Sequence, residues 1–314
     1  MKIVDDLEEE LLARLGGEDG GRTITKLEGT RWGRLILPSP EEAARRPVQG
    51  LKVLAIGSWT LGLLSLEALL SVEGERPRDI RLVGLVTDDP LDADARISVK
   101  KRFWRYYSQS EQEEYEWALL HRALPLGIPC YTGEVKCDAF RALLAQWDPE
   151  VIVVAAFGQL IDTPIIYFPK YGIYNLHPSD LLHGHGAGPQ PWEDLVQRRA
   201  SSTRVTLHRV SPEIDSGDIV GQSPEINVLM PDGSFSDDVR MVGEKTLVPV
   251  RAMVRELVLA LMEKKASGDE GPLDALDFEQ VFSHGFKKRL REPLDPLKHG
   301  RILPLSEEEM RYTV

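Results

Sequence analysis

Asn175 and His177 stand two residues apart in the segment IYNLH, whose apolar residues suit a buried strand. Residues at this spacing point to the same side of a strand, so we expect the amide and the imidazole to converge on one small volume. An Asn can donate a hydrogen bond to an oxyanion as it forms, and a His can stabilise charge or exchange a proton near neutral pH. The pair suits acyl transfer, which also needs a carboxylate to orient the imidazole.

Asp215 is the best supplier of that carboxylate. It lies in the turn-rich segment SPEIDSGD, between two predicted strands that contain RVTLHRV and DIVGQSPEINV. A carboxylate beside a His fixes the ring and favours its charged form. Each residue also has an ordinary explanation, since Asp is common in turns and His177 could be a core histidine that is fully hydrogen-bonded. The three residues together favour a catalytic site.

A metal site is the alternative use of these histidines. His177, His183 and His185 lie within nine residues, and His208 follows later in the chain. Two imidazoles two residues apart can bind one ion. Asp180 is the one nearby candidate for a third ligand, and the pattern is incomplete, so we predict no metal.

The elements that must position these residues alternate between strand and helix patterns from residue 51 onward. LKVLAIGSW is a continuous apolar run, as expected for a parallel strand buried on both faces. The later strand patterns are IRLVGLVTD, IPCYT and VIVVAAF, and the helix patterns between them are TLGLLSLEALLSV, EQEEYEWALLHRAL and DAFRALLAQW. This order predicts an α/β fold with a doubly wound, mostly parallel, Rossmann-like sheet.

Asn175 and His177 end a strand, where ligands of such sheets gather. The first strand-to-helix turn contains Gly57 and Gly62 without the spacing of a dinucleotide site, and Trp59 would crowd a pyrophosphate there. Dinucleotide binding is therefore a weak alternative.

Three segments are expected along the chain. Residues 1–50 form an N-terminal extension in which Gly and Pro interrupt every run after a short helix pattern, residues 51–235 form the catalytic domain, and residues 236–314 form a helical C-terminal extension with a tail. Ser236-Asp237-Asp238 starts a helix that should run to about Met262, with a kink at Pro249. From Ala266 onward the chain is loop-like and locally basic.

Composition narrows the class of partner. The 314 residues include 42% hydrophobic and 28% charged residues, which is ordinary for a globular enzyme. A net charge of -12 argues against a surface built to cover phosphates. The sequence has no run of about 18 apolar residues and no signal-peptide pattern, so we expect a cytoplasmic protein with no membrane partner.

The segment NLHPSDLLHGHGAGPQPW, followed by RVTLHRVSPEIDSGDIV, resembles the active-site region of the formyltransferases that use 10-formyltetrahydrofolate. The preceding VIVVAAFGQLI is similar to their strand and folate-site loop, and the resemblance runs from about Leu51 to Val228. It implies catalytic roles for Asn175, His177 and Asp215. It implies folate contacts by Phe157, Gly158, Gln159, Leu160 and Ile161, and by Ser179, Leu181 and Leu182.

The sequence departs from this family between Leu181 and Gly186. The family usually has Leu-Leu-Pro, then an aromatic or basic residue, then Arg-Gly, whereas this chain has Leu-Leu-His-Gly-His-Gly after an extra Asp180. The departure bears on the folate contacts and on the choice of acceptor, and it leaves the three catalytic candidates in place.

The resemblance implies formyl transfer to an amine, with 10-formyltetrahydrofolate as donor and no metal. We expect a small-molecule acceptor, such as an amino-sugar nucleotide or glycinamide ribonucleotide. Methionyl-tRNA stays open, although the roughly 50 residues after Met262 are few for the C-terminal barrel of tRNA formyltransferases. Hydrolysis of formyltetrahydrofolate and a noncatalytic folate-binding module are further alternatives, and the sequence leaves a homodimer open.

Overall fold

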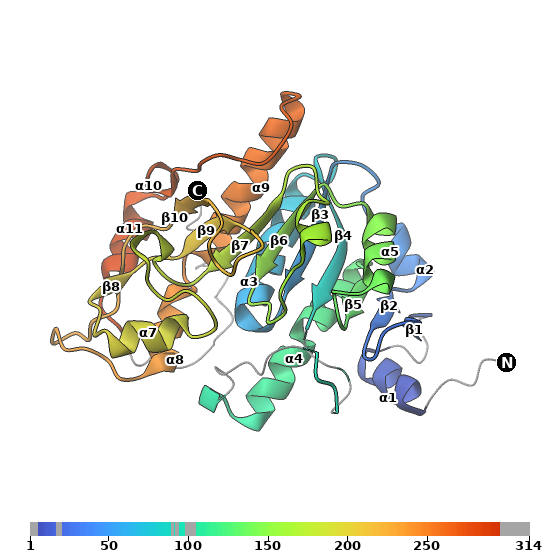
Figure 1. Cartoon of the computed structure of the whole chain (residues 1–314), viewed down its shortest axis with the longest axis horizontal. Coiled ribbons are helices and arrows are strands. Elements are labelled where there is room, and N and C mark those ends of the chain that lie inside the picture. The colour runs from blue at the N-terminus through green and yellow to red at the C-terminus, as the bar shows by residue number, and fades with distance from the viewer. Residues whose placement is uncertain (1–5, 17–20, 89–90, 92–93, 98–104, 296–314) are drawn as a thin grey trace. The chain divides into compact units, whose positions relative to one another are not determined.

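The computed structural model describes the chain except residues 1–5, 17–20, 89–90, 92–93, 98–104 and 296–314. The chain forms two compact units, whose helices and strands are labelled in Figure 1. Unit 1 comprises Met1–Lys100 and Gln109–Ile173, and unit 2 comprises Lys101–Ser108 and Tyr174–Val314. Among the described residues, no helix combines the length and the apolar character needed to cross a membrane.

The sheet of unit 1 has the strand order β1-β2-β5-β4-β3-β6. Its strands β3, β4, β5 and β6 pair in parallel, whereas β1 and β2 pair antiparallel to each other and β2 pairs antiparallel to β5. The strands are β1 (Thr23–Lys26), β2 (Arg34–Leu37), β3 (Leu51–Gly57), β4 (Ile80–Thr87), β5 (Cys130–Thr132) and β6 (Val151–Ala155). All five residues of β6 are buried, as expected for a parallel strand covered on both faces.

The helices of unit 1 follow the predicted alternation. They are α1 (Asp6–Arg14), α2 (Pro40–Ala44), α3 (Trp59–Glu75), α4 (Gln109–Ala123), α5 (Asp138–Trp147) and α6 (Thr163–Ile166), with a 3-10 turn at Leu124–Leu126. α3 packs on β3, β4 and β6, and α4 packs beside α3. The predicted α/β fold with a mostly parallel sheet is confirmed.

The turn between β3 and α3 bears on dinucleotide binding. Trp59 is 1% exposed in this turn. The pyrophosphate of a dinucleotide would lie against this turn in a Rossmann fold, and dinucleotide binding stays the weak alternative that the spacing of Gly57 and Gly62 predicts.

Unit 2 contains the later strands and helices. Its strands β7 (Ile173–His177), β9 (Thr206–Arg209) and β10 (Ile219–Gln222) pair antiparallel, and β8 (Ser202–Thr203) pairs antiparallel with β11 (Ile226–Asn227). Its helices are α7 (Pro191–Gln197), α8 (Val239–Thr246), α9 (Val250–Ala266), α10 (Phe278–Val281) and α11 (His284–Arg291), with a 3-10 turn at Leu181–His183.

Two local expectations for the C-terminal segment change. Asp238 caps α8 by accepting a hydrogen bond from the Met241 amide, as predicted, but the helix stops at Thr246 and a new helix begins after Pro249. Proline cannot donate the backbone hydrogen bond that a continuous helix needs, so a break replaces the expected kink. The segment after Ala266 is not entirely loop-like either, because Asp277 and Ser283 cap α10 and α11.

Candidate active site

Asn175 and His177 share one face of β7, as predicted. β7 pairs antiparallel with β9 in a register that places Asn175 opposite His208 and His177 opposite Thr206. Directly opposed residues of an antiparallel pair project to the same face of the sheet. The register therefore brings the amide and two imidazoles together in unit 2.

The loop between β9 and β10 places Asp215 beside these residues. The Asp215 carboxylate accepts a hydrogen bond from the Gly188 amide at 2.8 Å, and its oxygens lie 3.6 Å from His177 Nδ1 and 3.5 Å from Asn175 Nδ2. The Asp215 side chain is 11% exposed. Two backbone features shape the loop, a φ of 50° at Asp215 and a close approach of Gly217 to the Arg209 carbonyl.

His177 is held from both sides of its ring. Its Nε2 lies 2.7 Å from the carbonyl oxygen of Gly186, and its Nδ1 faces Asp215. A carbonyl oxygen only accepts hydrogen bonds, so Nε2 carries a proton. Ser179 also donates to the Gly186 carbonyl, at 3.2 Å. The segment that departs from the family pattern thus supplies a direct hydrogen-bond partner of the imidazole.

His208 is also a member of this cluster, although its sequence pattern indicated only a metal ligand. It is 2% exposed, its Nδ1 donates to the Arg209 carbonyl at 2.9 Å, and its Nε2 accepts from Asn175 Nδ2 at 3.0 Å. Burial lowers the pKa of His208 below its usual value, against the opposing effects of the Arg209 carbonyl and Asp215. A neutral ring with its proton on Nδ1 fits both contacts and fixes the orientation of the Asn175 amide. The alternation of RVTLHRV pointed to a strand, but the sequence did not show its partner strand.

We expect His208 to make folding stability depend on pH. A His whose folded-state pKa lies below its unfolded value of about 6.5 favours the folded state above that pH, and this contribution is lost as the pH falls. Between pH 7.5 and 5.5 the melting temperature of the wild type should fall more steeply than that of His208→Gln, which cannot take up a proton. Thermal scans over this range measure both slopes. His177 and Asp215 face His208 and are unchanged in the variant, so equal slopes would contradict the assignment.

The residues of unit 1 that the family resemblance assigns to folate form one loop after β6. The Gly158 amide donates to Asp88 Oδ2 at 2.6 Å, and the Gln159 side chain accepts from the Val135 amide and donates to the Gly133 carbonyl. Leu160 is 52% exposed. The loop is therefore held in place and presents an apolar side chain to solvent. Phe157 and Ile161 are half-buried in the same loop.

The assigned residues of unit 2 follow the same pattern. Ser179 is buried, and the Leu181 amide donates to Thr206 Oγ1 at 3.2 Å. Leu182 is 61% exposed. The backbone of this segment is thus held in place while the Leu182 side chain lies in solvent.

The metal alternative receives little support from the histidines after β7. His183 Nδ1 lies 2.8 Å from Asp180 Oδ2, and Gln222 donates to Asp180 Oδ1 at 2.8 Å. Burial tends to raise the pKa of Asp180, but the hydrogen bonds from Gln222 and His183 outweigh it and hold the pKa below its usual value. Asp180 and His183 are thus engaged with each other. In the described part of the chain, no group of three or more His, Cys, Asp or Glu side chains is arranged to hold a metal ion.

Comparisons with known proteins show what the sequence is similar to. Residues 129–250 match the family described as "Formyl transferase". The chain is 31% identical over 144 residues to a methionyl-tRNA formyltransferase of Thermotoga neapolitana, covering 46% of this chain and 42% of the relative. It is 27% identical over 203 residues to a methionyl-tRNA formyltransferase of Chloroflexus aurantiacus, covering 64% of this chain and 58% of the relative.

A solved structure shares the fold. The glycinamide ribonucleotide transformylase 1 of Symbiobacterium toebii aligns with a TM-score of 0.51 and 19% identity, covering 68% of this chain and 88% of that chain. Each of the two curated relatives is matched over less than two thirds of its own length.

Proposed function

We propose that this chain, whose residues 129–250 belong to the formyl transferase family, transfers a formyl group from a folate donor to an amine. The observation that carries the proposal is the cluster of Asn175, His177 and Asp215, in which one carboxylate reaches both the imidazole and the amide. These are the side chains that acyl transfer needs for oxyanion stabilisation and proton movement.

The chemistry assigned to the site is a displacement at the formyl carbon. The unprotonated acceptor amine forms a bond to this carbon, and the bond between the carbon and the donor nitrogen breaks. Asn175 and His177 stabilise the negative charge that develops on the formyl oxygen. Asp215 orients His177 and helps to move the proton that the attacking amine loses, directly or through water, and that proton is delivered to the donor nitrogen as it leaves.

His208 acts as a positioning residue in this scheme. Its Nε2 accepts one amide hydrogen of Asn175, which fixes the plane of that side chain. An amide that is already oriented does not have to rotate when negative charge develops on the substrate. Because burial lowers the pKa of His208, the ring stays neutral and able to accept at neutral pH.

The donor we propose is 10-formyltetrahydrofolate. The family resemblance assigns the loop from Phe157 to Ile161 and residues Ser179, Leu181 and Leu182 to the folate, and each set is considered within its own unit. Each set combines a hydrogen-bonded backbone with an exposed leucine. A flat pteridine needs apolar contact over its faces, which an exposed leucine in either set can offer.

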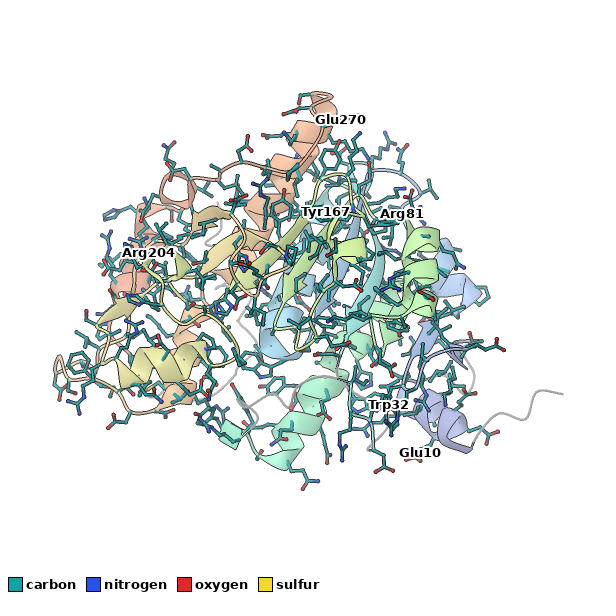
Figure 2. All side chains as sticks on the ribbon, viewed as in Figure 1. Glu10, Trp32, Arg81, Tyr167, Arg204 and Glu270 are labelled. Carbon is teal, nitrogen blue, oxygen red and sulfur yellow. The ribbon has the colours of Figure 1, made fainter. Side chains whose placement is uncertain are left out.

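For the acceptor we propose a small-molecule amine, of the amino-sugar nucleotide or glycinamide ribonucleotide type. Two cations of unit 2 are candidates for binding the phosphate of such an acceptor, Arg204 (labelled in Figure 2) and Lys287. Each of them already lies near a carboxylate oxygen of Glu279, at 3.6 Å for Arg204 and 3.5 Å for Lys287. The net charge of -12 weighs against a large phosphate-rich partner. Methionyl-tRNA is the second candidate, because both curated relatives carry that activity in their names.

The decisive experiment offers the full chain 10-formyltetrahydrofolate with one acceptor at a time. The acceptors are an amino-sugar nucleotide, glycinamide ribonucleotide and charged initiator tRNA, with buffer alone as a fourth arm. The absorbance change of the folate reports formyl loss. Turnover with one small amine supports the proposal. Turnover only with charged tRNA would identify methionyl-tRNA as the acceptor instead, and turnover in buffer alone would indicate a hydrolase. Folate binding with no formyl loss in any arm would contradict catalysis.

A further inference from the structure

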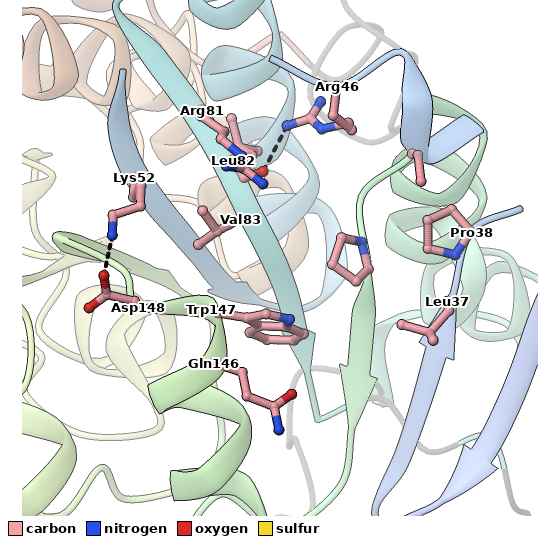
Figure 3. A pocket seen from close by; sticks show the side chains of 13 residues that line it. Leu37, Pro38, Arg46, Lys52, Arg81, Leu82, Val83, Gln146, Trp147 and Asp148 are labelled. Atoms are coloured by element: carbon pink, nitrogen blue, oxygen red, sulfur yellow. Dashed lines mark hydrogen bonds and ion pairs between the residues drawn. The ribbon is translucent and has the colours of Figure 1, made fainter. Parts of the chain in front are cut away.

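A cavity of about 520 Å³ lies in unit 1 at the amino ends of the parallel strands (Figure 3). Its lining comes from the start of β3 and β4, the end of α5, and the segment of residues 37–46 in the N-terminal extension. The volume is within the range of small-molecule sites. We call this cavity the β4 pocket.

The β4 pocket is remote from the loop assigned to folate in the same unit. Arg81 lines the pocket near the start of β4, and Asp88, which holds Gly158, follows the end of that strand. Seven residues of extended chain span roughly 23 Å. The pocket is therefore a separate site of unit 1, and nothing in the proposed formyl transfer uses it.

One wall of the β4 pocket is held by a buried ion pair. Arg46 forms two contacts of 2.5 Å with the Glu73 carboxylate. It also donates a hydrogen bond to the Leu82 carbonyl at 2.7 Å, which is drawn as a dashed line in Figure 3. Glu73 in turn accepts from the Leu82 amide at 2.6 Å. Such a paired Arg has a fixed geometry. The wall formed by the N-terminal extension is thus formed before any ligand arrives.

The opposite wall presents an aromatic side chain. Trp147, at the end of α5, lies over Gly84 of β4, where an added Cβ would come within 2.7 Å of the indole ring. The absence of a side chain at Gly84 lets the ring lie close to the sheet. Trp147 is half-buried and lines the cavity, so part of the indole is left for an occupant. Val83 and Pro38 add apolar surface to the same cavity.

The charge of the lining favours an anion. Three cationic side chains and one carboxylate line the β4 pocket. Lys52 is paired with Asp148, and Arg46 is paired with Glu73. Arg81 makes only a long hydrogen bond to the Val48 carbonyl, at 3.4 Å, and no described carboxylate is within ion-pair distance of it. Its guanidinium is therefore available to a ligand acid, in a chain whose net charge is -12.

We propose that the β4 pocket binds a small ligand with a flat aromatic ring and one acidic group. The ring lies against Trp147, and the acid, a phosphate or a carboxylate, pairs with Arg81. Stacking on an indole face tolerates different ring systems, whereas a guanidinium favours planar or tetrahedral oxyanions through paired hydrogen bonds. The ligand is recognised by these two features together.

Titration calorimetry on the full chain tests the proposal with four probes. Adenosine 5′-monophosphate and quinaldate carry a flat ring with a phosphate or a carboxylate, adenosine carries the ring alone, and ribose 5-phosphate carries the acid alone. We expect at least one of the first two to bind with a Kd below about 1 mM, and the two single-feature probes to bind at least tenfold more weakly. The probe of the first two that binds shows whether the acidic group of the ligand is a phosphate or a carboxylate.

Variants locate the binding. Arg81→Gln should raise the Kd of the probe that binds by about 10- to 100-fold, because this substitution removes a charge-assisted contact. Arg78→Gln is the matched control, an exposed Arg of the same segment outside the lining, and should bind like the wild type. Trp147→Leu should also weaken binding, with circular dichroism to verify its fold. Failure of both ring-acid probes to bind, equal binding of adenosine, or undiminished binding by Arg81→Gln would each overturn the proposal.

Discussion

Replacing His177 with Asn lowers the turnover of 10-formyltetrahydrofolate by about two to four orders of magnitude. The side chain of His177 is 9% exposed, faces the Asp215 carboxylate through Nδ1 and is bound to the Gly186 carbonyl through Nε2. Asn can keep a hydrogen bond to Gly186, but it can neither gain a proton nor relay one. The loss should therefore appear in kcat, with a smaller change in KM, because the ring acts on charge that develops during the reaction.

His183→Asn is the matched control for this prediction. His183 lies six residues later, its side chain is 63% exposed, and it contacts Asp180. We expect turnover within about twofold of the wild type, as for an exposed residue outside the reaction. A His177→Asn variant with near-normal turnover would remove this residue from the mechanism. A large loss in His183→Asn would instead revive the metal alternative.

Replacing Gly217 with Ala should lower kcat/KM by about 100-fold, although this residue touches no substrate in the proposed mechanism. A Cβ added at Gly217 would lie 1.8 Å from the carbonyl oxygen of Arg209, so one of two backbone segments must move. Asp215 stands two residues earlier in the same loop and would move away from His177 and Gly188. A displacement of about 1 Å in such a site can cost this much rate.

Gly285→Ala separates this effect from a general sensitivity to losing a glycine. Gly285 lies in α11, and an added Cβ would meet nothing within 4 Å. Ala favours helices over Gly, so this variant should keep full activity and an equal or higher melting temperature. Full activity in Gly217→Ala would show that the loop can relax without displacing Asp215.

Much of the architecture could be predicted from local patterns. The continuous apolar runs at β3, β4 and β6 marked parallel strands, and DAFRALLAQW corresponds to α5 from its first residue to its last. The two-residue period of a strand was enough to place Asn175 and His177 on one side. Such signals need only neighbouring residues, so one sequence can carry them.

The features that were missed depend on pairing between distant segments. His208 joins the cluster because β9 pairs with β7 in one register, and a shift by one residue would turn it to the other face. The carbonyl of Gly186 reaches His177 through the conformation of a loop that local patterns do not define. The β4 pocket likewise needs the N-terminal extension to pack against β4 and α5. The catalytic roles and the segment boundaries remain predictions.

The hairpin formed by β1 and β2 has a consequence for solubility. β2 pairs with β5 through Arg34, Leu35 and Ile36, and so covers the open hydrogen-bonding side of β5. An uncovered strand edge is a template for pairing with another chain. The first part of the chain thus shields a strand formed about 100 residues later from self-association, and a chain trimmed of this hairpin would be exposed to intermolecular β-pairing at β5.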